Sequence, residues 1–168
     1  MFALLANSGA FGQPAGTPRM VTPVVVNPAA PTITILPAAT GAMLRNQGTR
    51  NASLDLGRVS YFRGTSAPGQ SIRKQPGAFV ISTRFALKVD CPGSSSSSRV
   101  NVTMSRLDAA DLHAISIDGT PVRSSEQTLV QSMPCGSAGE HRLEVAVPVS
   151  TPAGTIGSTV AFAATLNR

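Results

Sequence analysis

The sequence has little of what enzymes and nucleic-acid-binding proteins commonly use. Tryptophan is absent, tyrosine occurs once, and charged residues make up only 13% of the 168 positions. No run approaches the roughly 20 apolar residues that a membrane-spanning helix needs, so we expect no membrane span. The net charge is +6, but the basic residues are scattered and no arginine and aromatic stacking motif accompanies them. We therefore expect a basic surface and no nucleic-acid partner.

The usual catalytic motifs are also missing. There is no GxSxG nucleophile motif and no phosphate-binding glycine loop between a strand and a long helix. His113 lies near Asp108 and Asp111, so a hydrolase built on that histidine and one of the many serines is a hypothesis that replacing His113 would test. A histidine near the start of a strand is more often part of the surface. We predict no enzyme activity and no cofactor.

Cysteine occurs only twice, as Cys91 and Cys135, and no CxxC pair exists. Together with His113 and His141 these thiols do not match the spacing of a compact zinc site, so we predict no metal. A disulfide between them would close a long loop, stabilise the fold by about 4 kcal/mol and indicate an oxidising compartment. Two separate buried thiols in a cytosolic protein are the alternative.

What the sequence does have is alternation with a period of two. In GAFVISTRFALKVDC (77–91), Phe79, Ile81, Phe85 and Leu87 share one parity, and the other parity is mostly polar. An extended chain would therefore carry one apolar and one polar face. This strand should pack through its apolar face on an opposing sheet.

Further alternating segments, separated by Gly and Pro turns, predict about seven or eight strands. The expected strands and turns are TITIL (32–36), 54–61 with a bulge at Gly57, RVNVTMS (99–105), Ile115 to Ile117 followed by a hairpin at Asp118–Gly119, a run leading to Cys135, Leu143 to Val149, and 155–168. Residues 63–77 look like loop, and 107–112 like a single helical turn. The fold class we predict is all-β, a two-sheet sandwich.

The chain divides into two parts. Residues 1–31 are rich in Pro, Ala and Gly and form an extended arm or linker, and residues 32–168 form the sandwich domain. The first residues resemble the end of a signal peptide with small residues before Phe11, or else an ordinary N-terminus.

Several short motifs in order resemble bacterial pilus subunits of the chaperone and usher type, including the spore coat U-like branch. They are LDLG (54–57), a glycine-bearing loop, FALKVDC (85–91), PAGT (152–155) and a terminal alternating strand. The resemblance implies an incomplete immunoglobulin-like sandwich that the N-terminal arm of the next subunit completes. The chain lacks the cysteine that common pilins carry ahead of the LDLG strand, and also their tyrosine near the C-terminus.

Strand donation needs a donor and an acceptor. The first donor candidate is MVTPVVVN (20–27), with Val24 and Val26 or Val21 and Val25 facing inward, and the second is FALLANSGAF (2–11); a plain linker is the alternative. The acceptor-groove candidates are Phe85, Leu87, Val160, Phe162 and Leu166.

The leading hypothesis is a non-enzymatic subunit of a pilus, fimbria or surface coat that is exported through the periplasm to the cell surface. Its expected partners are further copies of itself or related subunits and, by resemblance, a periplasmic chaperone and an outer-membrane usher. The alternative is a virion or tail decoration protein with a complete sandwich, which would behave as a monomer or a small closed ring.

Overall fold

The fold is known from a computed structural model, which describes residues 30–41, 44–54, 56, 68–94, 97–108, 113–151 and 157–167. Eleven strands and no helix occur in these ranges, so the predicted all-β class is confirmed. No stretch within these ranges forms a helix of the length and apolarity that a membrane crossing demands.

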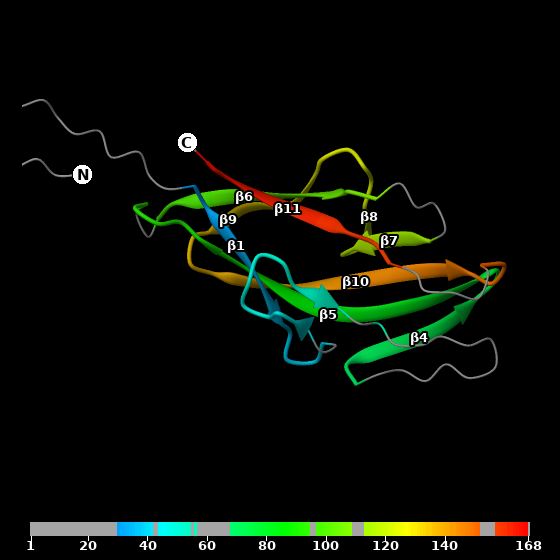
Figure 1. The fold of residues 1–168 in the computed structure, drawn as a ribbon. Coiled ribbons are helices and arrows are strands. Elements are labelled where there is room, and N and C mark those ends of the chain that lie inside the picture. The colour runs from blue at the N-terminus through cyan, green and yellow to red at the C-terminus, as the bar shows by residue number, and fades with distance from the viewer. Residues whose placement is uncertain are drawn as a thin grey trace, which may run out of the picture.

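The strands form two main antiparallel sheets and one short ribbon (Figure 1). The larger sheet has the order β1-β5-β10-β7-β8, with β4 also paired to β5. Its strands are β1 (Thr32–Pro37), β4 (Gln70–Gln75), β5 (Ala78–Asp90), β7 (Ala114–Ile117), β8 (Thr120–Pro121) and β10 (Ala138–Pro148). The smaller sheet has the order β11-β6-β9, with strands β6 (Arg99–Arg106), β9 (Gln127–Pro134) and β11 (Val160–Leu166). The ribbon pairs β2 (Leu44–Arg45) with β3 (Ser53–Leu54).

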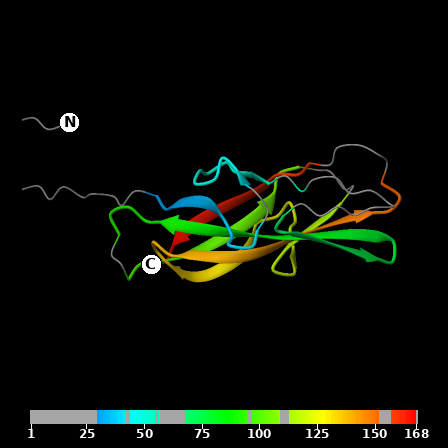
Figure 2. The same cartoon turned by 90° about the horizontal axis from the view of Figure 1, so that it is seen from below.

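The core lies between the two main sheets, as a sandwich requires (Figure 2). Its fully buried side chains come from both layers: Leu87, Val89 and Ile117 from the larger sheet, and Val100, Val102 and Met104 from the smaller one. Of the predicted apolar stripe of β5, Phe85 and Leu87 belong to this core and Ile81 is buried, whereas Phe79 is only partly buried. Val80 and Ala86, on the opposite parity, are buried as well, so the outer face of β5 is also covered in places.

Two local predictions can be compared directly with the backbone. Asp118 and Gly119 have φ angles of 51° and 79° and join β7 to β8, which confirms the hairpin. Val149, expected on the apolar face of β10, is 43% exposed because that strand ends at Pro148.

The loop predicted for residues 63–77 is wrong in its second half, because Gln70–Gln75 forms β4. This strand lies at the edge of the sheet, and Ile72 is its one apolar residue, so its sequence carries no alternation for periodicity to detect. The predicted bulge at Gly57 falls outside the described residues. Of the helical turn predicted over 107–112, residues 109–112 also fall outside them, and Leu107 and Asp108 are not helical.

Candidate functional site

The outer edge of β11 is the candidate functional site. In the ladder with β6, the Asn167 amide donates to the Arg99 carbonyl at 2.8 Å and the Leu107 amide donates to the Thr159 carbonyl at 3.0 Å. In an antiparallel pair, backbone groups turn toward the neighbour at every second residue. The odd-numbered residues of β11 therefore bond to β6, and the N–H and C=O groups of Val160, Phe162, Ala164 and Leu166 point the other way. None of these four has a backbone partner among the described residues.

The sequence of β11 carries none of the features that keep an edge strand from pairing with another chain. The strand VAFAATL contains no charge and no proline, and it pairs with β6 without a register shift. The other edge of the same sheet is different: β9 has two register shifts against β6, and Ser132 has a φ of 54°. Charges, prolines and bulges are the devices that keep edge strands from pairing with other chains. Within the described ranges, β11 is thus a regular edge without charge, proline, bulge or covering strand.

The side chains along this edge belong to the core. Val160, Phe162, Ala164 and Leu166 are partly buried and pack against the core cluster, while Ala163 and Thr165 are exposed. The Phe162 ring lies 5.9 Å from the Phe85 ring, centroid to centroid, across the two sheets. The edge therefore offers an unpaired backbone ladder next to a half-covered apolar surface.

Strand β1 lies beside β11 on the opposite sheet (Figure 1). Ile33 and Ile35 of β1 are partly buried against the same core. The outward backbone groups of Ile35 are bonded to residues 48 and 49, whereas those of Ile33 have no backbone partner in the described part of the chain. The open edge of β11 thus faces a second edge that is only partly closed.

The predicted acceptor residues divide between the edge and the interior. Val160, Phe162 and Leu166 lie on β11, whose outer edge has no strand partner among the described residues. Phe85 and Leu87 are only 6% and 0% exposed, so they lie deeper, on β5 in the centre of the larger sheet. The donor candidates Val21, Val24, Val25 and Val26 lie outside the described residues.

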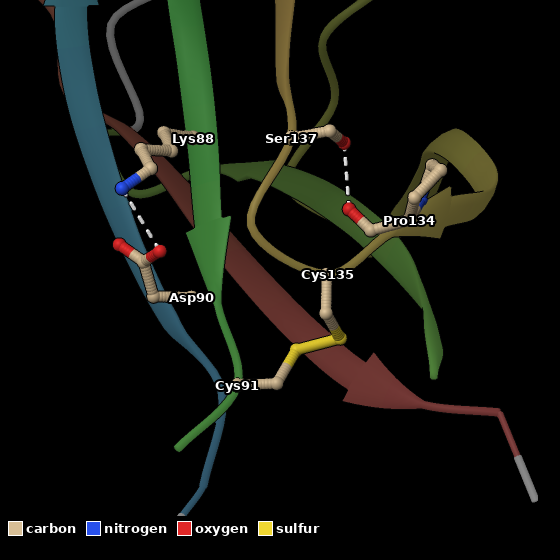
Figure 3. Close-up of a disulfide and its surroundings, with 6 residues drawn as sticks. All are labelled: Lys88, Asp90, Cys91, Pro134, Cys135 and Ser137. Carbon is tan, nitrogen blue, oxygen red and sulfur yellow. Dashed lines mark hydrogen bonds and ion pairs between the residues drawn. A yellow bond between two sulfur atoms is a disulfide. The ribbon is translucent and has the colours of Figure 1, made fainter. Parts of the chain in front are cut away.

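A disulfide joins Cys91 to Cys135, with Cα atoms 5.6 Å apart (Figure 3). Cys91 follows the last residue of β5, and Cys135 lies in the turn between β9 and β10, so the bond ties the larger sheet to the end of the smaller one. The Ser137 hydroxyl donates to the Pro134 carbonyl at 2.6 Å and closes the turn around Cys135. The predicted pairing is confirmed. It also removes both thiols from any metal site, and the described residues contain no cluster of three or more metal-binding side chains.

The start of β11 is held in place by Asp108, which the sequence had suggested only as a neighbour of His113. Its carboxylate accepts hydrogen bonds from the Ser158 hydroxyl at 2.7 Å and the Thr159 amide at 2.8 Å. The Arg106 guanidinium lies 2.9 Å from it, and these hydrogen bonds, with that of Arg106 foremost, hold the pKa of Asp108 well below its usual range. No sequence pattern identifies this anchor, because Ser158 and Thr159 lie 50 and 51 residues from Asp108.

Both histidines are buried, so neither is the surface residue that the sequence suggested for His113. His113 is 5% exposed, and burial, assisted by the charge of Arg106, lowers its pKa, which favours the neutral ring. His141 pairs through Nδ1 with an Asp118 carboxylate oxygen at 2.7 Å, and that carboxylate also accepts from the Arg142 amide at 2.7 Å. This pair is a structural cross-link of the β7–β8 hairpin to β10.

A scan against protein-family models and a search of curated proteins both found no match to this chain.

Proposed function

We propose that the chain is a non-enzymatic structural subunit of an extracellular pilus, fimbria or surface coat. In this proposal the sandwich is immunoglobulin-like and incomplete, and a neighbouring subunit completes it by donating a strand. The observation that carries the proposal is the charge-free outer edge of β11, which has no strand partner in the described part of the chain and lies beside partly buried apolar side chains. An added strand bonds to such a ladder and covers such a surface in one step.

The disulfide supports the export that the proposal requires. Cys91 and Cys135 are bonded to each other, and disulfides persist in oxidising compartments such as the periplasm and the cell exterior. The donor in this proposal is the arm of residues 1–31, with 20–27 as the first candidate segment. The partners are further copies of this chain, and a periplasmic chaperone and outer-membrane usher would serve its assembly.

Proline substitution tests the β11 edge without disturbing the subunit itself. Ala164→Pro removes an N–H that points away from β6, so the internal ladder keeps its bonds while an added strand loses one of its own. Ala163→Pro removes an N–H that faces β6 and serves as the matched control. We expect the full chain to form polymers by size-exclusion chromatography, Ala164→Pro to stay monomeric with an almost unchanged unfolding midpoint, and Ala163→Pro to lose stability.

Deleting residues 1–31 identifies the donor. If the arm donates, the deletion yields monomers, and a synthetic peptide of residues 20–27 stabilises them against heat. Unchanged polymerisation after the deletion would exclude the arm as the donor. Unchanged polymerisation of Ala164→Pro would exclude β11 as the acceptor, and a full chain that stays a stable monomer would favour the virion or tail decoration protein.

A further inference from the structure

Two arginines stand directly opposite each other on the larger sheet. Arg84 of β5 is the cross-strand partner of Arg142 of β10, and both are exposed. Their parity is opposite to that of Phe85 and Leu143, so both side chains lie on the outer face of the sheet, away from the core. Like charges at directly opposed positions destabilise an antiparallel pair. The fold alone gives no reason for this arrangement.

Only one of the two charges is compensated. An Arg142 guanidinium nitrogen lies 2.8 Å from a Glu144 carboxylate oxygen, and the Ser82 hydroxyl donates to the same oxygen at 3.1 Å. Arg84 has no hydrogen bond or ion pair to any residue in the described ranges. A partly compensated pair of guanidinium groups therefore faces solvent from the middle of the sheet.

The two arginines line a shallow, open hollow of about 410 Å³ on the surface of the sheet. The rest of its lining is polar or glycine and includes the hydroxyl groups of Thr40, Ser71 and Ser82. No large apolar side chain of the described residues lines it, and the nearby Glu144 carboxylate is engaged by Arg142 and Ser82, which leaves the charge of Arg84 uncompensated. Both the charge and the hydrogen-bonding groups of the hollow therefore suit a small, polar, negatively charged ligand.

The topology explains how a hollow forms here. β1 pairs with residues 85–90 of β5 and β4 pairs with residues 78–83 along the same edge, so Arg84 falls in the gap between these two strands. The loop over residues 38–41 supplies a wall, because Gly41 packs so closely on the Arg84 carbonyl that a side chain at position 41 would clash with it. The side of the hollow formed by residues 38–41 is thus fixed by a close approach of two backbone segments.

We propose that this hollow binds an oxyanion attached to a hydroxylated body, such as a sugar acid or a sugar phosphate. Guanidinium groups bind carboxylates and phosphates through paired N–H donors, which a lysine at the same place would not reproduce. The hydroxyls of Ser71 and Thr40 are suited to the ligand's own hydroxyl groups. This is a ligand-binding activity beyond subunit assembly, and it uses a different face from the β11 edge.

The test is an NMR titration of the full chain with D-glucuronate and with glucose 6-phosphate, each up to about 50 mM, to cover weak binding. We expect saturable shifts of the amides around Arg84 and Arg142 with one or both anions, and none with glucose. Comparing the two anions distinguishes a carboxylate ligand from a phosphate ligand. Arg84→Gln should weaken binding by about ten-fold or more, and Arg84→Lys should weaken it less.

Arg123→Gln is the matched control, because it removes the same charge from an exposed arginine outside the hollow. The ligand-free Arg84→Gln protein should melt at the same temperature as the parent or slightly higher, since it loses a repulsion. A variant that melts lower would contradict the assignment of Arg84 to ligand binding. No saturable binding of either anion, equal binding of glucose, or equal weakening by Arg123→Gln would overturn the proposal.

Discussion

Removal of the disulfide should lower the stability of the subunit by an amount that follows from its place in the chain. Cys91 and Cys135 are 44 residues apart. In the chain-entropy model, releasing a loop of that length from the unfolded state costs about 4 kcal/mol of folding free energy. For a domain of this size, a loss of that order lowers the melting temperature by roughly 8–16 °C. The double variant Cys91→Ala/Cys135→Ala avoids placing an unpaired hydroxyl in a partly buried position.

The assay is urea unfolding followed by far-UV circular dichroism, with and without a reducing agent. Reduced parent protein and the double variant should unfold at the same urea concentration, and the reducing agent should leave the variant unchanged. The denaturant dependence should also steepen in both, because the unlinked unfolded chain is less compact. A loss below about 1 kcal/mol would refute the entropic argument, since it would mean that the unfolded chain gains almost no freedom.

Two further predictions concern the carboxylate contacts of Asp108 and Asp118. Because the Arg106 guanidinium and the Ser158 hydroxyl keep the pKa of Asp108 low in the folded state, the stability that Asp108 contributes should be present above its unfolded pKa of roughly 4 and be lost as the pH falls below that value. Asp108→Asn should remove this part of the acid sensitivity, measured as the urea midpoint at a series of pH values; an unchanged pH profile would count against it. Asp118→Ala should cost about 2 kcal/mol, because it strips a buried histidine of its Nδ1 partner and places alanine at a positive φ. Asp118→Asn should cost clearly less by the same assay, and equal losses would contradict this explanation.

The sequence by itself determined the class of the fold and much of its core. Strict alternation placed Phe85 and Leu87 of β5 on the buried face, since side chains in a strand point to opposite faces in turn. The Asp118–Gly119 pair defined a hairpin because two consecutive positive φ angles favour those residues. The disulfide followed from there being only two cysteines. The alternation and the hairpin are local signals, and two cysteines allow only one intramolecular pairing.

Strand β4 escaped prediction because an exposed edge strand has no apolar face to bury, and burial is what creates the alternating signal. The anchor of Asp108 on Ser158 and the opposition of Arg84 to Arg142 join residues about 50 to 60 positions apart. Such contacts depend on strand order and register. A sequence of this kind specifies which face of each strand is apolar, because the side chain at each position determines it. Only the tertiary structure decides which strands become neighbours and which edge, here that of β11 among the strands described, is left without one, because pairing depends on the whole sheet.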